Sequence, residues 1–173
     1  MATTTHPAET AAIPADLGLA GLRVVFGGLI AAHGTQKLFG WFDGPGWRAN
    51  ADTFETIGYR PGEFFGTLAG LAELTGGLLL VLGLVTPLAG AIVLGTMINA
   101  VNATWSGGLL TGQGYEAPLL YGVVAAVLAF TGAGRFSLDR GRSWERPGIR
   151  LAGAAAALGV GAAIGTLILK ALL

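Results

Sequence analysis

The sequence contains five long apolar runs, and these restrict the possible folds more than any other feature. The runs cover residues 17–39, 64–86, 87–105, 117–133 and 151–173. A helix needs about 20 apolar residues to cross a bilayer core about 30 Å thick. A soluble bundle would instead need polar residues on roughly half of each helix surface. The pattern therefore predicts an all-α fold, a polytopic membrane helical bundle.

The composition agrees with this fold class and excludes several functions. Charged residues make up 12% of the chain, against about 25% in soluble domains. The formal net charge is zero and no basic stripe is present, so we expect no nucleic-acid partner. The chain has no cysteine, which excludes disulfides and thiolate-bound metal clusters. We predict no metal site, and any electron-transfer role must use a partner's redox centre.

Residues 1–16, rich in Ala and Thr, are predicted to form a disordered tail.

The basic residues in the loops predict the orientation of the helices. Residues 134–150 are predicted to be cytoplasmic because basic loops stay on that side. This orientation places the N-terminus in the cytoplasm, and the C-terminus and residues 40–63 outside, with a short amphipathic helix at 50–57. The basic residues of the cytoplasmic loop are Arg135, Arg140, Arg142, Arg146 and Arg150.

Ionisable residues inside apolar spans are costly and are functional-site candidates by default. Depth estimates at about 1.5 Å per residue bring most of them to one level in the predicted outer half of the bundle. Glu73 could accept an anion or proton, His33 could change charge near neutral pH, and Lys37 could supply a counter-charge. The same groups could equally form interhelical hydrogen bonds that only stabilise the bundle. The candidate pocket residues are His33, Gln36, Lys37, Glu73, Asn99, Asn102, Tyr115 and Glu116.

Other residues in the spans have simpler expected roles. Arg23 is close enough to the predicted cytoplasmic end of its run to extend its charged group to that surface. Small residues recur at helical spacing in two runs, and such faces allow close helix packing in lipid. The predicted packing residues are Gly66, Gly70 and Gly77 in the second run, and Gly153, Ala157, Gly161 and Gly165 in the last.

Four separated motifs resemble the DoxX family of bacterial membrane proteins. They lie at residues 32–42, 70–77, 114–119 and 134–139. The resemblance covers about residues 17–140 and implies a compact four-helix bundle in the bacterial inner membrane. The last apolar run adds a fifth transmembrane helix. The predicted organisation is a tail at 1–16, a DoxX-like domain at 17–140, and a basic loop with an additional helix at 141–173.

The resemblance also indicates a function. Similar family members are linked to thiosulfate:quinone oxidoreductase or to oxidoreductase assemblies that handle oxidative stress. It therefore implies an integral membrane subunit of a respiratory or redox complex, with no covalently bound cofactor. The pocket would receive a quinone headgroup or a small anion, and the partners would be the lipid bilayer and other subunits.

Two alternatives belong to other functional classes. The chain could be a non-enzymatic membrane anchor or assembly protein that docks a partner through its small-residue helix faces. A carrier for a small solute is a weaker alternative, because carriers usually show inverted repeats or broken helices. In this sequence only the glycine-rich stretches of the first and second runs are weakly similar.

Overall fold

The computed structural model describes residues 7–173, with side chains described from Ile13 onward. In this part of the chain, regular structure is helical and no strand occurs. The predicted all-α fold class, including the additional C-terminal helix, is confirmed. The helices are α1 (Pro7–Phe39), α2 (Gly46–Thr56), α3 (Gly62–Leu82), α4 (Thr86–Ala103), the short 3₁₀ helix η1 (Trp105–Gly107), α5 (Glu116–Thr131) and α6 (Ile149–Leu172).

Four of these helices are long and apolar enough to cross a membrane. They are α3, α4, α6 and the part of α1 from Ile13 onward. The remaining apolar run forms α5, which has 16 residues and spans about 24 Å at 1.5 Å per residue. Large apolar side chains are exposed on the outer helix faces, Val25 and Leu120 among them. A lipid environment explains this exposure, since helices satisfy their own backbone hydrogen bonds in hydrocarbon.

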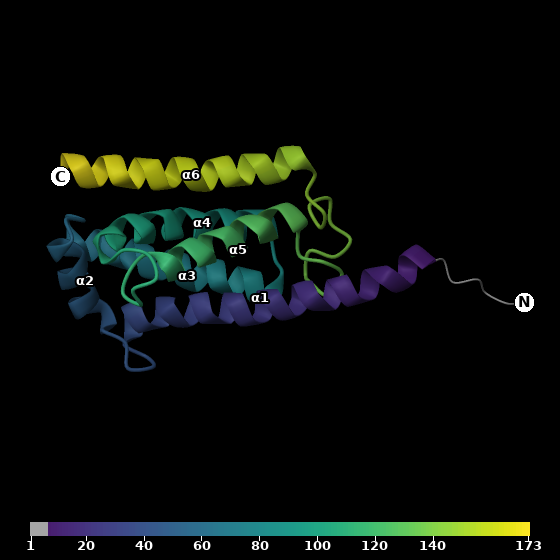
Figure 1. Cartoon of the computed structure of the whole chain (residues 1–173), viewed down its shortest axis with the longest axis horizontal. Helices are drawn as coiled ribbons and strands as arrows, with labels where there is room; N and C mark the ends of the chain where they lie inside the picture. Colours follow the sequence, from purple (N-terminus) through teal and green to yellow (C-terminus); the bar gives the residue numbers. More distant parts are fainter. Residues whose placement is uncertain (1–6) are drawn as a thin grey trace, which may run out of the picture.

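The helices form a bundle with α1 and α6 on opposite sides, as Figure 1 shows. Between them lie α3, α4 and α5, and α2 lies across the end of the bundle that also holds the C-terminus. The most extensive packing joins α1 to α3, and α4 to both α5 and α6. The buried core is formed by Phe26, Ile30, Leu80, Val93, Met97 and Leu128, with small residues between them.

Close contact between α1 and α3 depends on glycine. A Cβ atom on Gly34 would lie 2.7 Å from the Gly70 carbonyl oxygen, and one on Gly27 would lie 2.7 Å from the Gly77 oxygen. The predicted small-residue face of α3 therefore packs on α1 at Gly70 and Gly77. Gly66 lies on the side of α3 that faces α2, where a Cβ would meet the Asn50 amide.

Within the chain, the small-residue face predicted for α6 does not pack on another helix. A Cβ on Gly153, Gly161 or Gly165 would have no atom within 4 Å, and Ala157 is exposed. The helix packs through a different set of small residues instead. Because α6 carries small residues on several sides, spacing alone does not select its packing face. The face is selected by α4, whose Gly95 would place a Cβ 2.7 Å from the Gly159 oxygen. The buried residues of α6 are Ala152, Ala155, Gly159 and Ala163.

The N-terminal segment also differs from the prediction. Helix α1 begins at Pro7, so residues 7–16 of the expected disordered tail are helical, and residues 1–6 lie outside the described residues. Asp16 is buried, and its carboxylate accepts a hydrogen bond of 3.1 Å from the backbone N–H of Arg135. This contact between residues far apart in the sequence stabilises the helix. The composition of residues 1–16 gives no sign of such a contact.

The turn between α3 and α4 encloses a buried arginine. Arg23 is 1% exposed, and its guanidinium donates to the carbonyl oxygens of Leu80 at 3.0 Å and Phe136 at 2.6 Å. The expectation that Arg23 would extend to the surface is therefore wrong. The last carbonyls of a helix have no partners within it and carry partial negative charge. Arg23 binds such groups at the end of α3 instead of water.

Gly83 ends α3 beside this arginine. Its N–H donates a hydrogen bond to the Leu80 oxygen, and the Leu84 N–H donates one to the Leu79 oxygen. These are the two hydrogen bonds of a Schellman motif. Gly83 has a φ of 60°, and a Cβ there would lie 2.5 Å from the Ser137 Cβ. Glycine is therefore required both for the backbone conformation and for space.

Asp139 fixes the start of α4. Its carboxylate accepts hydrogen bonds from the N–H groups of Val85 at 2.7 Å and Thr86 at 2.8 Å. These are among the orphan donors of a helix N-terminus, and a carboxylate there is also favoured by the helix dipole. The motif at residues 134–139 therefore has a structural role: it brings a distant acid to the α3–α4 turn.

Candidate functional site

A cavity of about 420 Å³ lies between α3, α4 and α6 at the end of the bundle covered by α2. Most of its wall is apolar, and a few polar groups are concentrated within it. The apolar wall includes Phe54, Phe65, Leu68, Ile92, Ala100 and Ala163. The polar lining residues are Lys37, Tyr59, Glu73, Thr96, Asn99, Thr104 and Thr166.

An ion pair between α1 and α3 forms part of the cavity wall. Lys37 Nζ lies 2.5 Å from Glu73 Oε2, and the two side chains are 24% and 6% exposed. Lys37 lies in the last turn of α1, where a cation also interacts favourably with the helix dipole. Glu73 lies at the middle of α3. The pair therefore places a strongly polar group with no net charge against a mostly apolar space.

A second polar group surrounds Tyr59. The Tyr59 hydroxyl can donate its hydrogen to Asn99 Oδ1, 3.2 Å away, or to Asn102 Oδ1, 3.5 Å away. Lys170 Nζ donates to the same Asn102 oxygen at 3.1 Å and lies 4.2 Å from the centroid of the Tyr59 ring, a cation–π geometry. Burial raises the pKa of the Tyr59 phenol above its ordinary value of 10.0. This cluster joins the end of α6 to α4 and to the segment before α3.

Helix α2 holds Tyr59 in place at the cavity. Asn50 Nδ2 donates to the Gly66 oxygen at 3.0 Å, and Trp47 Nε1 donates to the Thr67 hydroxyl at 2.8 Å. Both bonds attach α2 to the first turns of α3. The Tyr59 ring then packs edge-on against Phe65, with centroids 5.6 Å apart. The end of the cavity is consequently built from two helices fastened by side-chain hydrogen bonds.

Comparison with known proteins identifies the family. The model of the DoxX family matches residues 18–107, which include α3, α4 and nearly all of the apolar part of α1. The chain belongs to the DoxX family. It is also 33% identical over 135 residues to an uncharacterized membrane protein of Mycobacterium tuberculosis, an alignment that covers 69% of this chain and 77% of the relative. No solved structure matches the chain.

The segment that defines the family contains most of the cavity. Lys37, Glu73 and Asn99 all lie within the matched residues of this DoxX protein, whereas α5 and α6 lie beyond them. The ion pair therefore belongs to the family segment. The side of the cavity at Ala163 and Thr166 comes from α6, outside that segment.

The structure brings only part of the predicted pocket together. Lys37, Glu73 and Asn99 line the cavity, and Asn102 lies beside it through Tyr59 and Lys170. His33 and Gln36 are not among the lining residues. Instead, His33 Nδ1 and Gln36 Oε1 lie 3.0 Å apart in a hydrogen bond, and the His33 ring is 6.2 Å from that of Tyr121. Gln36 also donates to the Phe42 oxygen at 3.1 Å.

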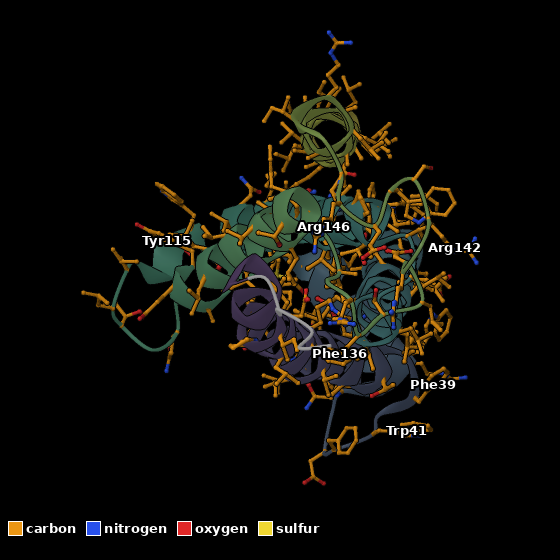
Figure 2. All side chains as sticks on the ribbon, turned by 90° about the vertical axis from the view of Figure 1, so that its right-hand side faces the viewer. Phe39, Trp41, Tyr115, Phe136, Arg142 and Arg146 are labelled. Carbon is orange, nitrogen blue, oxygen red and sulfur yellow. The ribbon has the colours of Figure 1, made fainter. Side chains whose placement is uncertain are left out.

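Tyr115 and Glu116 lie farther away still. Tyr115 stacks on Trp105, with ring centroids 4.7 Å apart and an interplanar angle of 11°, and it projects from one side of the bundle in Figure 2. Glu116 is exposed at the start of α5. The eight predicted residues therefore do not form one pocket. A common depth along the helix axes does not specify the direction of each side chain around its helix.

Two residues of the site, Tyr59 and Lys170, are not among those that the sequence pattern selects. A tyrosine directly before an apolar run is an available signal, because Tyr has an apolar ring and a polar tip suited to a membrane-proximal position. Lys170 is close enough to the end of its helix that its position alone predicts only contact with the membrane–water interface.

No group of three His, Asp or Glu residues close enough to hold a metal ion occurs among the residues the structure describes.

Proposed function

We propose that this DoxX protein is an integral membrane subunit of a respiratory or redox complex and that its cavity binds a quinone headgroup. The observation that carries the proposal is the Lys37–Glu73 ion pair on the wall of a mostly apolar cavity. Charged groups inside a membrane bundle are expensive and usually have a functional partner. A pair needed only for helix packing has no requirement to border an open space.

The size and lining of the cavity support a ligand of this kind. Small-molecule sites are typically about 300 to 1,000 Å³, mostly apolar, with a few well-placed polar groups. The cavity volume of about 420 Å³ lies within that range. A quinone combines a ring that carries two carbonyl oxygens with an apolar tail, so it matches a mostly apolar cavity bearing a few hydrogen-bonding groups.

The polar residues supply suitable chemistry. The Lys37 ammonium can donate a hydrogen bond to a quinone carbonyl, and Asn99 has a second amide hydrogen beyond the one it donates to the Gly95 oxygen. Reduction of a bound quinone takes up electrons and protons together. Glu73 can hold and release a proton beside the ring. The electrons would come from a partner subunit, since the chain has no cysteine to bind an iron–sulfur cluster.

The test compares two glutamates on the same helix. Glu73→Gln removes the acid at the cavity, and Glu63→Gln makes the same change at an exposed position in the first turn of α3. Each variant is reconstituted in nanodiscs, labelled with a photoreactive quinone and mapped by peptide mass spectrometry. We expect labelling of α3 and α4 peptides that Glu73→Gln reduces and Glu63→Gln leaves unchanged. Equal labelling of both folded variants would overturn the proposal.

One observation favours the alternative of a membrane anchor. Gly153, Gly161 and Gly165 form an outward face of α6, where an added Cβ would meet no atom within 4 Å, so another transmembrane helix could approach closely there. Gly161→Leu would then release a partner that co-purifies with the chain, whereas Ile164→Leu, at another exposed position of α6, would not. Retention of the partner by Gly161→Leu would exclude docking at this face.

A further inference from the structure

A second apolar groove lies at the opposite end of the bundle from the cavity. It has a volume of about 330 Å³ and is formed by the start of α4, the first half of α6 and one tryptophan from the loop between α5 and α6. Its lining residues include Val85, Leu88, Trp144, Leu151, Ala154 and Leu158. Both α4 and α6 are long and apolar enough to cross a membrane, so a groove between them is suited to contact with acyl chains.

Trp144 forms a fixed wall of this groove. Its indole Nε1 donates to Asp139 Oδ1 at 2.8 Å, the same carboxylate that binds the first amides of α4. The guanidinium carbon of Arg142 lies 5.5 Å from the centroid of the Trp144 ring. The apolar groove is therefore bordered at its end by an arginine stacked on one of its own wall residues.

The loop between α5 and α6, which supplies Trp144 to the groove, is rich in arginine. Figure 2 looks onto it, with Arg142 and Arg146 on the loop between α5 and α6. Arg140, Arg142, Arg146 and Arg150 are exposed, and none is within ion-pair distance of a carboxylate in the part of the chain the structure describes. The acids in the loop are already engaged: Asp139 binds α4, and Glu145 accepts a 2.6 Å bond from the Gly141 N–H.

We propose that this groove is a binding site for an anionic phospholipid. One acyl chain lies against α4 and α6, and the lipid phosphate pairs with Arg142 and its neighbouring arginines. Arginine is suited to this role because its planar guanidinium binds phosphate through two parallel hydrogen bonds. Basic pockets between transmembrane helices select anionic headgroups in the same way. A zwitterionic lipid would fill the groove but leave the positive charge unmatched.

The site is independent of the quinone proposal, because it shares no lining residue with the cavity near Glu73. Its experiment uses Trp144 as a natural probe. The full chain is reconstituted in phosphatidylcholine vesicles in which a minor lipid carries brominated acyl chains, either phosphatidylglycerol or phosphatidylcholine. Bromine quenches nearby tryptophan, and the signal of Trp144 is the difference between the wild type and Trp144→Phe. The other tryptophans lie at the α2 end: Trp41, Trp47 and Trp105.

We expect brominated phosphatidylglycerol to quench Trp144 more than brominated phosphatidylcholine at equal content. Arg142→Gln should lower this preference roughly fivefold, the fold-change that corresponds to about 1 kcal/mol for one arginine near a membrane surface. The control Arg48→Gln removes an equal charge at an exposed position on α2 and should leave the preference unchanged. Equal quenching by both lipids in the wild type would overturn the proposal.

A second pair of variants distinguishes a built site from general attraction to a charged surface. Ala154→Phe fills the groove, whereas Val160→Phe adds an aromatic ring to α6 at an exposed position that does not line it. The site predicts loss of the phosphatidylglycerol preference in Ala154→Phe and its retention in Val160→Phe. A preference that survives Ala154→Phe would show that the arginines attract anionic lipid without the groove, and it too would overturn the proposal.

Discussion

Arg23 and Asp139 bind opposite sides of the same turn. Arg23 donates to carbonyl oxygens at the end of α3, and Asp139 accepts from amides at the start of α4. The two side chains carry opposite charges, although no ion pair links them directly among the described residues. Residues 116 positions apart in the sequence thus complete the ends of two adjoining helices.

Replacing Arg23 should destabilise the bundle strongly. Arg23→Met keeps much of the side-chain volume but removes the donors to the Leu80 and Phe136 oxygens, leaving polar groups unpaired in a buried site. We expect a loss of about 2 to 4 kcal/mol in the free energy of unfolding. Arg23→Lys should lose less, because it keeps the charge. Denaturant titration in micelles measures both, with exposed Arg48→Met as the control; wild-type stability in Arg23→Met would contradict the expectation.

Close packing of α1 on α3 predicts opposite effects at two glycines. A Cβ at Gly77 would lie 2.6 Å from the Gly27 oxygen, whereas one at Gly28 would meet nothing within 4 Å. Gly77→Ala must therefore separate two helix backbones, at a cost of about 1 to 3 kcal/mol. Gly28→Ala should stabilise α1 by up to about 1 kcal/mol, since alanine has the higher helix propensity. Thermal unfolding of the two variants gives the comparison, and equal shifts would refute close contact at Gly77.

The Lys37–Glu73 pair predicts unequal costs for its two partners. Lys37→Met leaves the Glu73 carboxylate, 6% exposed, without its counter-charge, and should cost about 3 kcal/mol of unfolding free energy. Glu73→Gln should cost less because the longer Lys37 side chain, 24% exposed, can extend toward water. The double variant Lys37→Met with Glu73→Gln should recover part of the loss. A double variant whose loss equals the sum of the single losses would show that the groups are not coupled.

The burial of Tyr59 predicts that the stability of the folded protein decreases at alkaline pH. Burial raises the pKa of its phenol in the folded protein, so the folded state holds the proton more tightly than the unfolded state. The contribution of this group to stability is complete below its unfolded pKa of about 10 and is lost as pH rises through the folded pKa. Phenolate absorbance, measured as the difference between wild type and Tyr59→Phe, should titrate later in folded protein than in denatured protein. Coincident titrations would contradict the burial of Tyr59.

Several elements could be predicted because local sequence determines them. Each apolar run becomes a helix, since a run of this length in lipid can satisfy its backbone only within itself. Residues 50–57 fall largely within the short helix α2, which covers Gly46–Thr56. The motifs that resemble DoxX identify the family, and the matched segment carries both members of the ion pair. These properties depend on composition, length and short motifs.

Other features depend on which surfaces meet. The sequence places His33 and Glu73 at one level, but the direction of each side chain around its helix follows from packing, so His33 pairs with Gln36 and Glu73 with Lys37. Both small-residue faces of α6 have suitable spacing, and the approach of Gly95 on α4 decides which one is buried.

By itself, the sequence determined the fold class, the membrane setting and the family, because hydrophobic run length and local motifs are properties of contiguous residues. The tertiary structure decided the membership of the cavity, the burial of Arg23 and the capping role of Asp139. Those properties arise when residues far apart in the chain satisfy one another's charge, hydrogen bonds and volume, and no local pattern encodes such a match.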